Sequence, residues 1–118
     1  MRVSYAIVFV SDMKASVSFY RDTLRIPVRF ESPGWTEFAT DGATLALHLG
    51  GSAGAKGDAS SEAAGQCRPG LRVPDLDAFH LRMVEKNVRC VQPPMSTFGA
   101  RLAQYADPDG LTISVGEG

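Results

Sequence analysis

A strand-to-helix junction that occurs twice in the chain is the feature that most constrains its fold. In the first copy an apolar run ends just before Asp12, and apolar residues then recur at helical spacing over residues 13–24. This pattern predicts a β-strand that feeds an amphipathic helix capped by Asp12. A second copy follows at residues 71–83, where Asp75 is the expected cap. Because internal repeats take precedence in assigning a fold, we expect two similar modules.

Three further strands are predicted after each helix. In the first half they cover residues 26–31, 35–40 and 43–49. In the second half they cover residues 88–92, 98–106 and 111–115, and Pro93-Pro94 is expected to end the first of these. With opening strands at 1–10 and 68–73, each half is predicted to run β-α-β-β-β.

Local patterns add four expectations. The run from Ala6 to Val10 is continuously apolar, which suggests burial on both faces of its strand. Asn87 follows the second helix at a position that tolerates a left-handed residue. His80 lies among polar residues of that helix and is expected at the surface. The apolar stripe of the first helix is expected in the core: Met13, Val17, Tyr20 and Leu24.

Residues 50–66 differ from both halves. Gly, Ala and Ser dominate this segment, and it shows no apolar periodicity. Such a composition is typical of a flexible connection. We therefore expect one domain of 118 residues, built from module 1 at 1–49, a linker at 50–66 and module 2 at 67–118. A chain of this length buries about two thirds of its unfolded surface, so it needs no disulfide or metal to fold.

Composition excludes several classes of partner. The formal net charge is −1 and no run of basic residues occurs, which argues against binding nucleic acid. The N-terminal apolar run is too short for a signal peptide or a membrane span, so we expect a cytoplasmic protein without a membrane partner. The two cysteines, Cys67 and Cys90, are expected to be reduced and are too few for a cysteine-rich zinc site.

The chain resembles the vicinal oxygen chelate superfamily, which includes glyoxalase I, extradiol dioxygenases and bleomycin-resistance proteins. The resemblance rests on Val10-Ser11-Asp12-Met13, Ser16, Phe19-Tyr20, Arg21-Asp22, Leu24, Asp107-Pro108-Asp109-Gly110 and Ile113. It implies an α+β fold in which two tandem βαβββ modules form a cup-shaped mixed sheet with the helices outside. It also implies a homodimer. One departure is Arg25, which stands where the family usually has Gly.

The metal site of the family's catalytic members is not matched. The resemblance places the four ligand positions of that site at Tyr5, Ala46, Arg68 and Ser114, and none of these is His or Glu. Ala46 has no donor atom, Tyr5 and Ser114 are poor ligands when neutral, and Arg68 would repel a cation. His48 lies on the same strand face as Ala46, but a catalytic zinc site needs three protein ligands. We therefore expect no metal cofactor; a divalent metal ion held by other ligands is the alternative.

Candidate ligand-binding residues follow from these positions. Trp35 suits stacking on a planar ligand, although a core or interface tryptophan is an equal alternative. Arg68 suits a carboxylate or phenolate ligand, and a surface ion pair is its alternative. His48 is either a pocket group or an ordinary residue at a strand end. Glu37 is either a base or counter-charge to Arg68, or a solvated surface residue. The predicted ligand-binding set is Tyr5, Trp35, Ala46, His48, Arg68 and Ser114; no catalytic residue is assigned.

Three functions are compatible with this site. The first is a metal-independent, small-molecule binding protein of the glyoxalase/bleomycin-resistance type, which holds a planar polar or anionic compound in the sheet cup. The alternative is a lyase, isomerase or dioxygenase-like enzyme of the same superfamily, with or without a divalent metal, in which His48 or Glu37 is the base. The third is a protein without a ligand whose dimer interface is its function. The sequence identifies neither the compound nor whether catalysis occurs.

Overall fold

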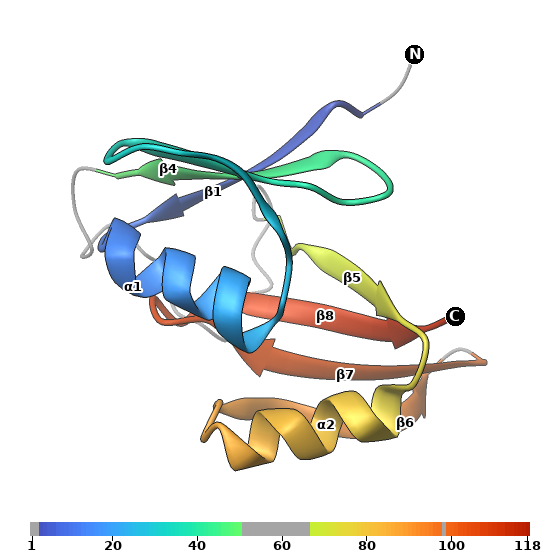
Figure 1. Ribbon diagram of the computed structural model, residues 1–118. Helices are drawn as coiled ribbons and strands as arrows, with labels where there is room; N and C mark the ends of the chain where they lie inside the picture. The colour runs from blue at the N-terminus through green and yellow to red at the C-terminus, as the bar shows by residue number, and fades with distance from the viewer. Residues whose placement is uncertain (1–2, 51–66, 98) are drawn as a thin grey trace. The chain divides into compact units, whose positions relative to one another are not determined.

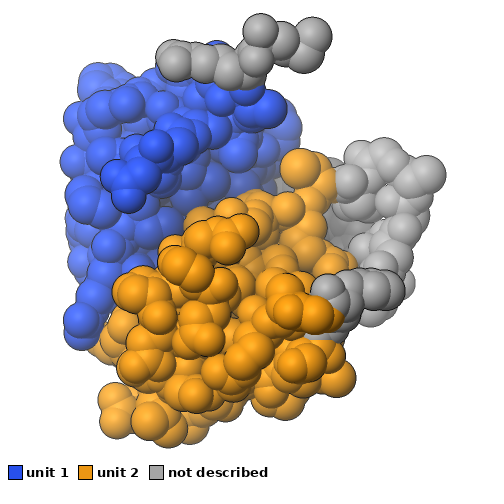
Figure 2. Space-filling model, turned by 90° about the vertical axis from the view of Figure 1, so that its right-hand side faces the viewer, with its two compact units in different colours: residues 1–56 blue, residues 57–118 orange. Residues whose placement is uncertain are grey.

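The computed structural model describes residues 3–50, 67–97 and 99–118 (Figure 1). The chain divides into two compact units, residues 1–56 and 57–118 (Figure 2). The expected linker at 50–66 lies outside the described residues, apart from Gly50. Within the described part of the chain, no helix has the length and apolar character needed to cross a membrane.

The first unit contains one helical segment and a four-stranded sheet in the order β1-β4-β3-β2. Its elements are β1 (Tyr5–Val10), α1 (Met13–Ser18), the π-helical turn η1 (Phe19–Thr23), β2 (Val28–Glu31), β3 (Trp35–Phe38) and β4 (Thr44–Leu49). Strands β1 and β4 are parallel, and the remaining pairs are antiparallel. The parallel pair needs a long crossover connection, and α1 lies within it across one face of the sheet (Figure 1).

The second unit repeats this arrangement in the order β5-β8-β7-β6, with β5 parallel to β8. Its elements are β5 (Gly70–Val73), α2 (Leu76–Glu85), β6 (Cys90–Thr97), β7 (Ala100–Ala106) and β8 (Thr112–Glu117). Each unit is therefore a βαβββ module with a four-stranded mixed sheet. The predicted α+β class with two tandem modules is confirmed.

Both helices begin at the aspartates that the sequence indicates. The backbone N–H of Ala15 donates to Oδ1 of Asp12 at 3.1 Å, and the N–H of Ala78 donates to Oδ1 of Asp75 at 3.0 Å. Each carboxylate thus satisfies a backbone donor that has no partner within its helix. This repeated cap fixes where the chain turns from strand to helix in both units.

Each core lies between the helix and the facing side of the sheet. In the first unit, the predicted helix stripe is buried together with residues of three strands: Met13, Val17, Tyr20, Leu24, Val8, Val10, Phe38, Leu45 and Leu47. In the second unit, the buried set is Leu76, Phe79, Met83, Ala103, Tyr105, Ile113 and Val115. Burial of these apolar side chains is the main favourable term for each module, at about 25 cal/mol per Å² removed from water.

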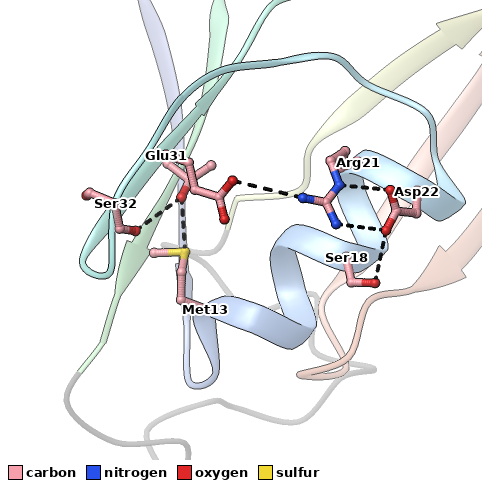
Figure 3. A network of polar contacts seen from close by, with 7 residues as sticks. Met13, Ser18, Arg21, Asp22, Glu31 and Ser32 are labelled. Carbon is pink, nitrogen blue, oxygen red and sulfur yellow. Dashed lines mark hydrogen bonds and ion pairs between the residues drawn. The ribbon is translucent and has the colours of Figure 1, made fainter.

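A polar network borders the first core on the helix side (Figure 3). Arg21 Nε lies 2.8 Å from Oδ1 of Asp22, and its Nη1 lies 3.9 Å from Oε1 of Glu31 on β2. The hydroxyl of Ser18 donates to Oδ2 of Asp22 at 3.3 Å. These groups are half exposed, so solvent screens each ion pair and its contribution to stability is small. These groups link η1 to β2, and Figure 3 also shows a contact inside the core, where the Thr36 hydroxyl donates to Sδ of Met13 at 3.4 Å.

Burial on both faces of the first strand was a wrong expectation. Ile7 is 48 % exposed and Phe9 is 67 % exposed, whereas Val8 and Val10 are buried. The reason is that α1 covers only one face of the sheet, so only alternate residues of β1 meet the core. Ile7 and Phe9 lie on the other face, where a large part of each side chain is exposed.

The strand that Pro93-Pro94 was expected to end continues through both prolines. Strand β6 covers Cys90–Thr97, and its register with β7 shifts between Cys90 and Gln92 and again between Gln92 and Met95. Because β6 is an edge strand of its sheet, the prolines remove no hydrogen bond that an outer neighbour requires. The two register shifts allow β6 to accommodate the prolines.

His80 also differs from its expected surface position. It is half-buried, and its Nδ1 lies 2.9 Å from the hydroxyl of Tyr105 on β7. The side chain therefore joins α2 to the sheet by a polar contact at the border of the second core.

Candidate binding site on the open face of the first sheet

The strand register of the first unit brings several predicted site residues onto one side of the sheet. Trp35 on β3 pairs with His48 on β4, and His48 pairs with Phe9 on β1. Residues that pair directly across strands share a face. The face opposite α1 is called the open face here and carries Tyr5, Ile7, Phe9, Trp35, Glu37, Thr44, Ala46 and His48. Four of the six predicted residues, Tyr5, Trp35, Ala46 and His48, thus lie together.

Aromatic rings cover much of the open face. The rings of Tyr5 and Trp35 meet edge to face with centroids 6.1 Å apart, and those of Trp35 and His48 meet the same way at 5.9 Å. Phe9 and His48 lie 5.1 Å apart in a tilted arrangement. Contacts of this kind hold each ring in a defined orientation. Four rings, contributed by β1, β3 and β4, therefore form one connected cluster.

Ala46 lies beneath this cluster, fully buried, between Ile7 on β1 and Glu37 on β3. Its methyl group gives the face an apolar floor without filling it. The small side chain of Ala46 suits this buried position, but it offers no donor atom to a ligand.

Glu37 is the polar centre of the open face. The indole N–H of Trp35 donates to its Oε2 at 2.8 Å, and Nη2 of Arg29 donates to its Oε1 at 2.9 Å. These bonds, that of Trp35 first and that of Arg29 next, lower the pKa of Glu37, and the Tyr5 hydroxyl adds to the effect. The carboxylate is therefore ionised and engaged at neutral pH. A carboxylate in this state is a weak base, which argues against a role for Glu37 in proton abstraction.

Arg29 reaches the open face through an irregularity in β2. Val28 pairs with Phe38 and Phe30 pairs with Glu37, so Arg29 and Phe30 together oppose Glu37. This is the geometry of a β-bulge, which re-aims side chains. Nη2 of Arg29 also donates to Oγ1 of Thr44 at 2.7 Å. Sequence reasoning missed Arg29 because a regular alternation along 26–31 does not reveal a bulge.

A hollow adjoins this network. It has a volume of about 500 Å³ and is lined by Val3, Ser4, Tyr5, Arg29, Asp41, Gly42, Ala43 and Thr44. Small-molecule sites commonly measure roughly 300–1,000 Å³, and the volume of this hollow falls within that range. Tyr5, Arg29 and Thr44 belong both to the hollow and to the surroundings of Glu37, which makes the two features continuous.

His48 has one ring nitrogen in use. Nδ1 lies 3.0 Å from the carbonyl oxygen of Leu49, which is able only to accept a hydrogen bond. Nδ1 is therefore the protonated nitrogen of the neutral ring, and Nε2 is left as an acceptor. The side chain is exposed, so this nitrogen is available to a ligand.

The remaining two predicted residues belong to the second unit. Arg68 is exposed and precedes β5, which begins at Gly70 rather than at Arg68 as expected. Ser114 is half-buried on β8 and pairs with Gly70 and with Gln104. Their participation in the same site as Tyr5, Trp35, Ala46 and His48 stays a prediction.

Two βαβββ modules, each with a mixed four-stranded sheet, define a protein of the glyoxalase-like class. The family model of the Glyoxalase/Bleomycin resistance protein/Dioxygenase superfamily matches residues 2–115, and the chain belongs to this superfamily. No curated protein matches its sequence.

Similar solved structures cover nearly the whole chain. A protein of unknown function from Agrobacterium tumefaciens str. C58 is 31 % identical, with a TM-score of 0.78 over 100 % of this chain and 94 % of the other. TnmS3, an antibiotic binding protein from Streptomyces sp. CB03234, is 28 % identical, with a TM-score of 0.77 over 99 % and 95 %. A lactoylglutathione lyase from Agrobacterium tumefaciens is 20 % identical, with a TM-score of 0.76 over 98 % and 92 %, and it shows the shared fold alone.

The metal of the superfamily's catalytic members does not fit the residues present here. Ala46 is buried and has no donor atom, and Tyr5, Arg68 and Ser114 are not ligands that a divalent cation prefers. Among residues 3–50, 67–97 and 99–118, no three His, Cys, Asp or Glu side chains cluster closely enough to hold an ion.

Proposed function

We propose that this chain is a metal-independent small-molecule binding protein that holds a planar compound with polar or anionic substituents against the open face. The observation that carries the proposal is the connected cluster of Tyr5, Phe9, Trp35 and His48 around an ordered carboxylate. Exposed aromatic faces attract planar rings by stacking, and the polar groups among them orient the bound compound.

The orientation of Trp35 supports stacking over hydrogen bonding. Its indole N–H is already bonded to Glu37, so the ring offers a ligand its apolar surface. Phe9 is largely exposed on the same face, which adds apolar area for a second ring of the ligand. A planar compound of two or three fused rings matches this surface better than a flexible chain, because fewer rotors are immobilised on binding.

The comparison with TnmS3 supports the same class of function. That structure is described as an antibiotic binding protein and is 28 % identical over nearly the whole of both chains. Binding a compound needs only shape, stacking and a few placed polar groups, which the open face supplies. Arg68 and Ser114 keep their predicted role as further ligand-binding residues. A homodimer, implied by the family resemblance, is part of the proposal.

The single tryptophan of the chain makes the proposal directly testable. A panel of planar aromatic acids and antibiotics is titrated while the emission of Trp35 and the thermal midpoint Tm are recorded. At least one compound is expected to change the emission saturably and to raise Tm. At a ligand concentration 100 times Kd the stabilisation is roughly 2.7 kcal/mol, which corresponds to a shift of several degrees.

Variants localise the effect. Trp35→Leu is expected to abolish the Tm shift because it removes the stacking surface. Leu81→Ala, at an exposed position on α2, is the matched control and is expected to keep the shift. If the whole panel leaves Tm and emission unchanged, the binding proposal is wrong. Stoichiometric metal in protein purified without chelator would instead support the enzyme alternative.

A further inference from the structure

Arg29, which reaches the open face from β2, has hydrogen-bond donors that the described residues do not use. A guanidinium carries five N–H donors. Nε and Nη2 of Arg29 donate to Oε1 of Glu37 at 3.3 and 2.9 Å, and Nη2 donates to Thr44 at 2.7 Å. Among the residues that the structure describes, none accepts a hydrogen bond from Nη1. The side chain is 49 % exposed and lines the 500 Å³ hollow.

We propose that Arg29 is the polar anchor of the binding site and that its Nη1 donates to a carboxylate or phenolate oxygen of the bound compound. The ring of that compound lies against Tyr5 and Trp35, and the Glu37 carboxylate links Trp35 to Arg29 through hydrogen bonds. The inference rests on the proposed function, because both use the open face. It names the chemical group that the site selects and the residue that selects it.

The geometry of Arg29 favours selective recognition because the side chain is held before a ligand arrives. Glu37 is only 18 % exposed, and it fixes one edge of the guanidinium while Thr44 fixes a neighbouring hydrogen. An arginine that is already ordered loses less conformational entropy when it binds. Its remaining N–H groups then form a directed, charge-assisted contact with an oxygen.

The charges near Arg29 set the limits of this selectivity. Glu37 offsets the charge of Arg29, so recognition depends on directed N–H donors rather than on a strong positive field. Asp41 lines the same hollow from the turn before β4 and repels an anion that lies near it. A ligand is therefore expected to place its oxygen toward Arg29 and a neutral part toward the turn.

Two naphthalene probes of equal ring size and opposite charge test the inference. Binding of 2-naphthoate and of 2-naphthylmethylammonium to the full chain is measured by isothermal titration calorimetry at pH 7. The wild type is expected to bind 2-naphthoate about tenfold more tightly, since a hydrogen bond to a charged group contributes that much. An equal or opposite preference overturns the inference, because Glu37 and Asp41 would then dominate.

Three variants assign the preference to Arg29. Arg29→Gln is expected to lose the tenfold preference while it still binds 2-naphthylmethylammonium, which shows that the site remains folded. Arg29→Lys keeps the positive charge but loses the planar set of N–H donors. Its preference for 2-naphthoate is expected to lie between those of the wild type and Arg29→Gln. Arg21→Gln is the control with the same change of net charge on η1, and it is expected to behave like the wild type.

The outcomes separate this inference from the proposed function. If 2-naphthoate binds equally well to the wild type and Arg29→Gln, the anchor is wrong and the stacking site stands. If 2-naphthoate does not bind the wild type at all, the anchor is wrong as well. In that case the proposed function stands only if another planar compound shifts Tm in the panel described above.

Discussion

The indole N–H of Trp35 donates to Oε2 of Glu37 at 2.8 Å, from two residues away on the same strand. This bond places the only tryptophan of the chain in contact with a carboxylate that Arg29 also holds. A change in the charge of Glu37 is therefore reported by Trp35 itself. The pair connects the aromatic and the polar parts of the proposed site.

The first prediction concerns acid stability. The pKa of Glu37 lies below its ordinary value of 4.5 in the folded chain, because Trp35 and Arg29 stabilise the ionised form. Its contribution to stability is present above pH 4.5 and is lost as the pH falls through the lowered, folded-state pKa. Glu37→Gln is expected to be less stable than the wild type at pH 7, and the difference is expected to shrink as the pH falls below 4.5. Urea denaturation at several pH values measures it.

Trp35 emission provides the matched readout for this prediction. The Trp35 emission of the wild type is expected to change over the same acid range while the chain remains folded. The emission of Glu37→Gln is expected to stay constant over that range. Asp77→Asn is the control, because Arg101 lowers the pKa of Asp77 in the second unit. That variant should keep the wild-type emission profile. An identical pH profile in Glu37→Gln and the wild type would contradict the assignment.

The elements of the fold were largely predictable because their signals are local. Asp12 and Asp75 are N-cap residues that indicate where the two helices begin, and the helical spacing of apolar residues identifies the buried side of each helix. Strand alternation with a period of two also places His48 on the same strand face as Ala46. Each of these inferences needs only residues close together in the sequence.

The contacts that the sequence did not reveal depend on register between distant segments. Arg29 joins Glu37 only because a bulge in β2 shifts its side chain. Pro93-Pro94 stays within β6 only because that strand is at a sheet edge and is irregular there. A pattern along one segment contains neither piece of information. The pairing of Arg29 with Glu37 therefore emerges from the folded sheet alone.

The second prediction concerns the residue after the first helix. Arg25 has a φ of 65° and Asn87, at the equivalent place in the second unit, has a φ of 58°. The prediction that Asn87 occupies a left-handed position is confirmed. A left-handed conformation costs most L-residues roughly 1–2 kcal/mol, whereas Gly and Asn adopt it easily.

Arg25→Gly is therefore expected to stabilise the chain by up to about 1 kcal/mol, after the added flexibility of the unfolded state is subtracted. Asn87→Gly is the matched variant and is expected to change stability by only a few tenths of a kcal/mol. Arg25→Val should be destabilising, since a β-branched residue tolerates positive φ poorly. Chemical denaturation compares the three, and a destabilised Arg25→Gly would show that Arg25 makes compensating contacts.

The third prediction concerns a hydroxyl inside the first unit. Ser16 is fully buried on α1, and its Oγ has no hydrogen-bond partner in the part of the chain that the structure describes. A buried polar atom without a partner is unfavourable, and alanine has a higher helix propensity. Ser16→Ala is expected to raise the free energy of unfolding by about 0.5–1 kcal/mol. Ser18→Ala is the exposed control and should be close to neutral. A loss of more than 1 kcal/mol in Ser16→Ala would contradict the expected gain.

The last prediction concerns the buried phenol of the second unit. Tyr105 is 1 % exposed, and its hydroxyl lies 2.9 Å from Nδ1 of His80. Burial raises the pKa of Tyr105 to about 12, above the ordinary value of 10. Between these two values the unfolded chain releases the phenolic proton and the folded chain retains it. Stability therefore falls as the pH rises, by at most a few kcal/mol (on the order of 1.4 kcal/mol per pH unit between the two values).

Tyr105→Phe separates the hydrogen bond from the titration. At pH 7 it is expected to cost about 1 kcal/mol, because His80 loses its partner at a half-buried position. Between pH 10 and 12 it should lose less stability than the wild type, since the titrating group is gone. Urea denaturation of both proteins across this range gives the difference in stability, in which the contributions of the other two tyrosines and of the lysines cancel. Parallel curves for the two proteins would mean that the folded chain does not hold the phenol in its neutral form.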